Sequence, residues 1–368
     1  MKWSWRLGRI SGIDVYMHAT FLLLIGWVAL SHWLDGQSVL ATVEGVAFIL
    51  ALFACVVAHE FGHALAARRF GIRTRDITLL PIGGLARLER MPEEPRQELW
   101  VALAGPAVNV VIAAILWVWL SVTGLLEPIS QLTVTRGAFL ERLLVVNLWL
   151  VGFNLLPAFP MDGGRVVRAL LALRFDYTQA TQIAANLGQI MAILFGFIGL
   201  FTNPFLVFIA FFVWIGAAQE ASMVQMRTSL AGIPVSRAMI TDFQTLSPRD
   251  TLERSINLIL AGSQHDFPVV DEGQIVGILL RNDLLAALTR AGQAARVEQI
   301  MRREFETADW AEMLEGASMR LRECGCHTMP VTRNGQLVGL LTMDNLGEFL
   351  MIQSALAGAR RRAGAASW

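Results

Sequence analysis

Apolar residues dominate the first 220 positions of the chain, whereas later residues mix apolar and polar positions. A membrane-spanning helix needs roughly 20 predominantly apolar residues. The pattern predicts six such helices, over 18–34, 41–67, 99–126, 138–156, 182–201 and 204–219. We therefore expect a polytopic α-helical membrane domain over 1–220, followed by a different kind of domain.

Residues 76–90 break this helical pattern. Residues of high β-propensity lie on both sides of Gly83-Gly84, which predicts a β-hairpin that re-enters the membrane domain. An ordinary connecting loop is the alternative. A strand edge in this place could bind an extended peptide by adding a strand, and we expect the segment 77–89 to hold substrate in this way.

The second part of the chain contains an internal repeat. Residues 267–279 match 329–341, and each copy has two short apolar runs around a glycine. Each copy follows an amphipathic helix, and the pattern of helices and strands predicts two similar α/β halves. We expect this domain at 221–352, with halves at 230–290 and 296–352. The segment 353–368 is predicted to be a flexible tail.

Arginine-rich and arginine-poor loops alternate between the predicted spans, and basic loops remain in the cytoplasm. The cytoplasmic set includes the loop after the fourth span, with Arg165, Arg168 and Arg174. This places the protein in the cell (plasma or inner) membrane as a multi-pass protein, with the second domain cytoplasmic.

Composition agrees with a membrane protein, because only 16% of the residues are charged, against about 25% in soluble domains. The formal net charge is zero, which argues against a nucleic-acid partner. The three cysteines, Cys55, Cys324 and Cys326, do not suggest a paired disulfide framework, as is typical of a reducing compartment.

The second apolar run ends in His59-Glu60-Phe61-Gly62-His63. Histidines four residues apart on a helix project from one face and can bind one metal ion. Glu60 is placed to take a proton from a water molecule on that metal. Ionisable groups are costly at membrane depth and usually functional there, although a buried histidine pair without metal is the alternative.

A catalytic zinc ion usually has three protein ligands and one open position. Asp162 is the candidate third ligand, because it follows the fourth span between two prolines and a Gly-Gly pair. A turn-forming aspartate is the alternative. The Asn154 amide is a candidate hydrogen-bond donor to the oxyanion, or a helix-packing group. The same two roles are open for Asn109.

Three motifs together resemble the site-2 protease family of intramembrane metalloproteases. They are His59–His63, Gly105–Asn109 and Asn154–Gly164, although Met161 stands where the family commonly has leucine. The resemblance implies one zinc ion per chain, bound by His59, His63 and Asp162, with Glu60 as general base. It also implies cleavage of a single-span membrane protein, such as a membrane-tethered anti-sigma or transcription factor, with the active site toward the cytoplasm.

Residues 230–350 resemble a tandem pair of CBS domains, for which an adenine nucleotide is the candidate ligand. Nucleotide-binding repeats have Thr or Ser followed three residues later by Asp. Here the first repeat has Leu280 and Asp283, and the second has Thr342 and Asn345. Asp283 and Thr342 are thus the candidate ligand residues, while formation of a homodimer or docking of a partner remain alternatives.

The leading hypothesis is an intramembrane zinc endopeptidase regulated by its CBS domains. A CBS-regulated membrane transporter or channel is the alternative, but it should place polar residues along a path through several helices. An inactive relative that serves as a binding scaffold is a third hypothesis, against which the intact set of His59, Glu60, His63 and Asp162 argues.

Overall fold

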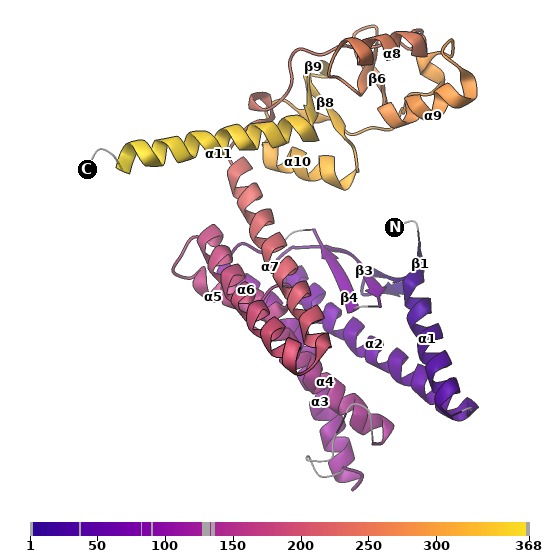
Figure 1. Ribbon diagram of the computed structural model, residues 1–368, viewed down its shortest axis with the longest axis vertical. Coiled ribbons are helices and arrows are strands. Elements are labelled where there is room, and N and C mark those ends of the chain that lie inside the picture. Colours follow the sequence, from indigo (N-terminus) through magenta and orange to yellow (C-terminus); the bar gives the residue numbers. More distant parts are fainter. Residues whose placement is uncertain are drawn as a thin grey trace. The chain divides into compact units, whose positions relative to one another are not determined.

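The computed structural model describes residues 3–36, 38–81, 83–89, 91–126, 133 and 137–365. The chain divides into two compact units, Met1–Val224 and Gln225–Trp368 (Figure 1). The first unit contains long helices and a four-stranded sheet. The second contains two small sheets with flanking helices.

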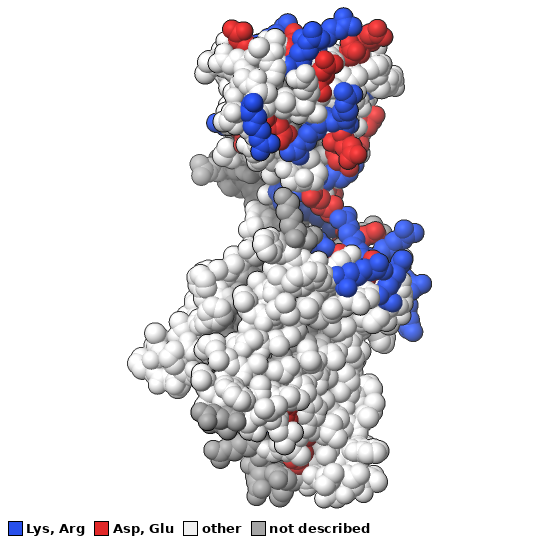
Figure 2. Space-filling model, turned by 90° about the vertical axis from the view of Figure 1, so that its right-hand side faces the viewer, with Lys and Arg blue, Asp and Glu red and all other residues white. Residues whose placement is uncertain are grey.

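Seven helices of the first unit lie in the described residues: α1 Ala19–Gly36, α2 Val39–Arg69, α3 Pro95–Val122, α4 Phe139–Asn154, α5 Asp162–Leu171, α6 Tyr177–Phe201 and α7 Pro204–Leu230. By length and composition, α2, α3, α6 and α7 can cross a membrane. Most of the face of this unit shown in the lower part of Figure 2 is uncharged, and its charged side chains gather mainly at one end. Of the six predicted spans, these four are supported, whereas those at 18–34 and 138–156 correspond to the shorter helices α1 and α4.

The sheet of the first unit has the order β1-β2-β3-β4. Its strands are β1 Ser4–Ile10, β2 Ile13–His18, β3 Thr74–Leu80 and β4 Gly83–Leu88. The predicted hairpin is present as the antiparallel pair β3 and β4, and β2 joins β3 in parallel. The pair β1 and β2 was not predicted. A Ser11-Gly12 turn with positive φ at both residues joins these two strands.

The segment after α4 differs from the prediction, which placed Arg165, Arg168 and Arg174 in a loop. Residues 162–171 form helix α5, and Arg168 has no solvent exposure. The helix is strongly amphipathic, and Gly163, Gly164 and Ala169 are buried with Arg168. A charged side chain can occupy such a position because carboxylates from other helices surround it, as described below.

The second unit begins in the last turns of α7 and contains η2 Val235–Arg237, α8 Leu252–Ala261, β5 Phe267–Asp271, β6 Gln274–Leu279, α9 Arg281–Ala291, η3 Val297–Gln299, β7 Ala308–Asp309, α10 Leu314–Glu323, β8 Thr328–Arg333, β9 Gln336–Thr342 and α11 Met343–Ala365. Helix α11 thus extends into the segment predicted as a flexible tail.

The internal repeat is visible in the geometry of the two hairpins, β5–β6 and β8–β9. Each has one register shift at the same repeat position, between Val269 and Val270 in one and between Val331 and Thr332 in the other. Each hairpin turns through two residues of positive φ, the second of which is glycine. This backbone is the type I′ turn, which glycine adopts without steric cost.

The two repeats exchange the segments that precede them. Ile240 pairs with Leu340 of the second repeat, and Arg302 pairs with Ile278 of the first. The hydrophobic core of the second repeat accordingly includes Leu230 and Val235, which lie at the start of the first half, before the β5–β6 hairpin. Each core is therefore completed by residues from outside its own repeat.

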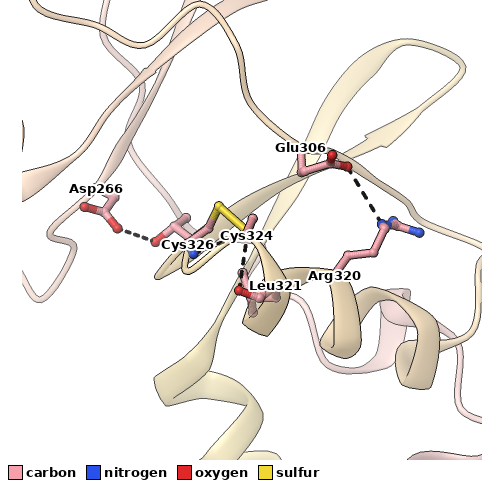
Figure 3. Close-up of a disulfide and its surroundings, with 7 residues drawn as sticks. Asp266, Glu306, Arg320, Leu321, Cys324 and Cys326 are labelled. Carbon is pink, nitrogen blue, oxygen red and sulfur yellow. Dashed lines mark hydrogen bonds and ion pairs between the residues drawn. A yellow bond between two sulfur atoms is a disulfide. The ribbon is translucent and has the colours of Figure 1, made fainter. Parts of the chain in front are cut away.

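Cys324 and Cys326 form a disulfide at the end of α10, so the prediction that the cysteines are unpaired is wrong for this pair (Figure 3). Gly325 between them has a φ of 62°, a left-handed conformation that turns the chain back on itself. The cysteines lie just before Thr328, whose hydroxyl donates to Asp266 in the segment preceding β5. Cys55 is a free, buried cysteine on α2.

Candidate metal centre

His59 and His63 lie one turn apart on α2, and Asp162 is the first residue of α5. The two Nε2 atoms are 3.1 Å apart, and the Asp162 Oδ2 atom lies 3.2 Å from that of His59 and 3.1 Å from that of His63. All three side chains are buried. The three predicted ligands therefore converge, with one donor atom each pointing to a common position.

The opposite ring nitrogens of the histidines bond to α3. The Nδ1 atom of His59 lies 2.6 Å from Asn109 Oδ1, and the Nδ1 atom of His63 lies 2.7 Å from the carbonyl oxygen of Val101. Both partners are acceptors, so each imidazole carries its proton on Nδ1 and keeps the lone pair of Nε2 free. Metal-binding histidines are commonly oriented in this way.

Two glycines allow the backbone to approach the centre closely. A Cβ atom on Gly105 of α3 would lie 2.2 Å from the Nε2 atom of His63, far inside van der Waals contact. A Cβ on Gly163 would lie 2.2 Å from the carbonyl oxygen of Leu156. The first glycine makes room for the donor atoms, and the second lets α5 begin tightly against the preceding loop.

The donor set suits zinc. The centre offers one carboxylate oxygen and two imidazole nitrogens, the mixture of oxygen and nitrogen ligands that zinc accepts in catalytic sites.

Glu60 lies beside this centre and against the sheet. Its Oε2 atom accepts a hydrogen bond of 3.2 Å from the backbone N–H of Ala86 on β4. Gly84 of the same strand packs on the Glu60 side chain, where a Cβ would lie 2.8 Å from Cγ. The predicted general base and the predicted substrate-binding strand are therefore in direct contact.

Comparison with known proteins agrees with this geometry. The family model of peptidase family M50 matches residues 47–136 and 129–196, and that of the CBS domain matches residues 235–290. Zinc metalloprotease MJ0392 of Methanocaldococcus jannaschii is 34% identical to this chain over 282 residues, which are 76% of this chain and 78% of that relative. The chain belongs to peptidase family M50.

Two further comparisons cover different shares of the chain. Rip3 of Mycobacterium tuberculosis is 29% identical over 367 residues, covering 94% of this chain and 92% of the relative. A solved site-2 protease from M. jannaschii covers 60% of this chain at 37% identity, with a TM-score of 0.44. The predicted class is confirmed: the chain is a membrane zinc metalloprotease with a CBS domain, and the transporter alternative is not favoured.

Asn154 forms its side-chain hydrogen bond within its own helix. Its amide donates to the carbonyl oxygen of Leu150 in its own helix, at 2.9 Å. The hydrogen bonds found among the described residues do not join it to His59, His63 or Asp162.

The two candidate ligand residues of the CBS pair already have polar partners. Asp283 forms a bidentate ion pair with Arg302, at 2.6 and 3.0 Å, and these hydrogen bonds raise the pKa of Arg302. The Thr342 hydroxyl accepts the backbone N–H of Asn345 at 3.1 Å. A nucleotide at either residue would have to share or replace these bonds.

Two residues that hold the histidines through hydrogen bonds, directly or through Asn109, were missed from the sequence: Val101 and Asn147. Asn147 of α4 accepts a hydrogen bond of 2.8 Å from the Asn109 amide. A lone asparagine in an apolar run is a usable signal, because polar groups in membrane helices usually bond to one another. Val101 acts through its backbone, which the residue type does not reveal.

Proposed function

We propose that this M50 peptidase hydrolyses peptide bonds in or near the transmembrane segments of single-span membrane proteins, with one zinc ion held by His59, His63 and Asp162. The observation that supports this most directly is the convergence of three buried donor atoms within 3.2 Å of one another. Two of these donors belong to a helix that is apolar enough to cross a membrane.

Zinc bound at this site would polarise the scissile carbonyl and acidify the attacking water. In the proposed reaction Glu60 accepts the proton of that water and later delivers it to the leaving amine. His59 and His63 would present Nε2 to the zinc ion, because their Nδ1 atoms lie against the Asn109 side chain and the Val101 carbonyl. Asn154 is proposed to stabilise the oxyanion, for which its amide would first leave the Leu150 carbonyl.

The substrate is proposed to bind along β4 as an added strand in a re-entrant hairpin. Strand β4 stands last in the sheet order, so one of its edges is not paired with a described strand. A transmembrane helix hides its carbonyls in internal hydrogen bonds and must unwind before it can be hydrolysed. An extended segment on β4 would lie beside Glu60, because the Ala86 amide already contacts that carboxylate.

The arrangement in the membrane is proposed to have six spans, with α1 and α4 crossing in addition to the four longer helices. The metal centre and the second unit are proposed to lie toward the cytoplasm, following the arginine-rich loops. The CBS pair, with Asp283 and Thr342 as candidate ligand residues, is proposed to regulate cleavage through an adenine nucleotide or a homodimer.

A direct test measures zinc content and cleavage on the full-length protein in liposomes, with a tagged single-span segment that has glycine and proline at its centre. Wild type should bind one zinc ion and cleave. Glu60→Gln should keep the zinc and lose about two to four orders of magnitude in rate. His59→Ala with His63→Ala should lose both.

The matched control for Glu60→Gln is Glu44→Gln, since Glu44 lies on the same helix and pairs with Arg142 instead. This control should cleave like wild type. Equal cleavage by wild type and Glu60→Gln would reject Glu60 as the base, and full zinc occupancy in the double histidine variant would reject the ligand assignment.

A further inference from the structure

A buried arginine lies on α5, the helix that begins with the predicted ligand Asp162. Arg168 of α5 has no solvent exposure, and its Nε atom donates to Oε1 of Glu98 on α3 at 2.7 Å. Its Nη1 atom donates to Oε1 of Glu220 on α7 at 2.5 Å. The guanidinium of α5 thus binds one carboxylate on α3 and one on α7. The side chain of Glu98 is completely buried, so water does not compete for its hydrogen bond with Arg168.

Aromatic rings hold the same guanidinium in place. Its Cζ atom lies 5.0 Å from the ring centre of Phe159 and 5.0 Å from that of Tyr177 on α6. Phe159 is fully buried in the loop that leads to Asp162. The planar arginine head is suited to combined ion pairing and stacking, which lysine cannot reproduce. Arg168 therefore fixes α5 and the loop before it at the same time.

Glu98, the inner carboxylate partner of Arg168, lies close in sequence to a group that contacts a predicted metal ligand. Glu98 precedes Val101 by one helical turn, and the Val101 carbonyl orients His63. Asp162 opens the helix that contains Arg168, and Gly163 and Gly164 pack this helix start directly on the backbone of 155–159. The Glu98–Arg168 pair consequently joins the α3 turn that supports a histidine to the helix that presents the aspartate.

Glu220 adds a third connection. It lies on α7, the single helix on which the chain passes from the first unit into the second. Its side chain is 27% exposed, whereas those of Arg168 and Glu98 are completely buried. The outer carboxylate can therefore move away at lower cost than the inner one, which is the asymmetry expected of an adjustable contact.

We propose that Arg168 is a positioning residue, which fixes Asp162 relative to His59 and His63, and that Glu220 makes this position depend on α7. This inference rests on the proposed zinc site. The fixed part of the contact is Glu98 with Arg168, and the adjustable part is Glu220. A shift of α7 would change the contact between Glu220 and Arg168 and so move α5 with Asp162. Of the three proposed ligands, Asp162 alone does not lie on α2.

The test uses full-length protein in detergent, with Zn²⁺ affinity measured by competition with a chelator. Arg168→Gln and Arg168→Lys should bind Zn²⁺ about 10- to 100-fold more weakly, the range found when partners of metal ligands are removed. Arg142→Gln is the matched control, because Arg142 also pairs with a glutamate, Glu44, and stacks on Phe48 at 4.1 Å. This control should keep wild-type affinity within about twofold.

A second measurement separates positioning from general stability. The visible spectrum of the Co²⁺-loaded protein reports ligand geometry, and it should change in Arg168→Lys but not in Arg142→Gln, even where both unfold at lower temperature. If Arg168→Gln does not fold, Glu220→Gln keeps the buried pair and should still weaken Zn²⁺ binding severalfold. Unchanged affinity and spectrum in the Arg168 variants would overturn the proposal, and unchanged affinity in Glu220→Gln would overturn its second part.

Failure of the proposed zinc site is distinguishable from failure of this inference. If wild type binds no Zn²⁺, or the double histidine variant binds as tightly as wild type, the site itself is wrong. If wild type binds through its histidines and Arg168→Gln binds equally well, only the positioning role is wrong.

Discussion

Asn109 accepts a hydrogen bond from His59 across 2.6 Å, although 50 positions separate them in the chain. The amide of Asn109 in turn donates to Asn147, whose own amide donates to the Leu143 carbonyl at 2.8 Å. A chain of buried polar groups therefore runs from His59 on α2 through α3 to α4. Asn109 thus makes hydrogen bonds between helices, which is the helix-packing role considered for it from the sequence, and one of its partners is the predicted ligand His59.

Replacing Asn109 with alanine should lower zinc affinity by about 10- to 100-fold, because His59 loses the acceptor that fixes its ring. Asn109→Asp should retain most of the affinity, since a carboxylate oxygen can accept the same proton. Chelator competition on the purified variants measures this difference. Equal affinities for the alanine and aspartate variants would show that the hydrogen bond does not orient His59.

Gly105→Ala should abolish metal binding although the substitution adds only one methyl group. The new Cβ would lie within 2.7 Å of the Nε2 atoms of both histidines, so α3 or the imidazoles must move. Gly152→Ala is the matched control, because nothing lies within 4 Å of a Cβ at that helical position. The control should bind zinc like wild type and be stabilised by up to about 1 kcal/mol. Zinc titration and thermal unfolding of both variants decide the matter.

A photo-crosslinker at Leu85 should form crosslinks to the residues next to the scissile bond of a single-span substrate. Helix-breaking residues in that substrate should increase both the crosslinking yield and the cleavage rate. Leu7 provides the control position, because it is also an exposed leucine on an end strand of the same sheet. Mass spectrometry maps the crosslinks. Equal capture at Leu7 and Leu85, or capture of distant substrate regions alone, would contradict binding along β4.

Asp283→Ala should weaken binding of ATP or AMP more than Asn345→Ala does, with the full-length protein titrated by calorimetry. Asp283 is held at the surface by Arg302 and can offer its carboxylate to ribose hydroxyls. Asn345 instead donates to the Ala238 carbonyl, and this bond stabilises the domain. Its replacement should cost about 1 kcal/mol of stability. The absence of binding heat with either nucleotide would leave docking or dimerisation as the role of the pair.

A nucleotide that binds should also change the cleavage rate. A ligand shifts a conformational equilibrium only if it binds one of the two states more tightly than the other. If the two states of the CBS pair differ in cleavage rate, this shift changes the observed rate. The measurement is the cleavage of the glycine- and proline-bearing segment with and without AMP. Tight binding with an unchanged rate would separate the CBS pair from control of catalysis.

The convergence of His59, His63 and Asp162 could be predicted from the sequence, because local rules determine most of its geometry. Helical periodicity puts His59 and His63 on one face, and a motif with proline and glycine brings Asp162 back to the same end of the helices. The support from Val101 and Asn147 could not be predicted in this way. It depends on which turns of α3 and α4 contact α2, and periodicity does not determine that pairing.

Two further differences have identifiable physical reasons. Strands β1 and β2 alternate apolar residues with arginine and aspartate around a Ser-Gly turn, a signal that was available but is weak in strands of this length. Arg168 was expected in a loop because it lies between the predicted spans 138–156 and 182–201. Its burial depends on Glu98 and Glu220, which approach it only in the folded chain.

The exchange of segments between the CBS repeats limits how this protein can be recombined. A chimera joined between Val235 and the β5–β6 hairpin would separate Leu230 and Val235 from the hydrophobic core that they fill. The junction must instead fall within α7, upstream of Leu230. There, inserting a single residue would rotate everything that follows by about 100°, since an α-helix has 3.6 residues per turn. Exchange of regulatory modules between relatives should therefore succeed only when the length of this helix is kept.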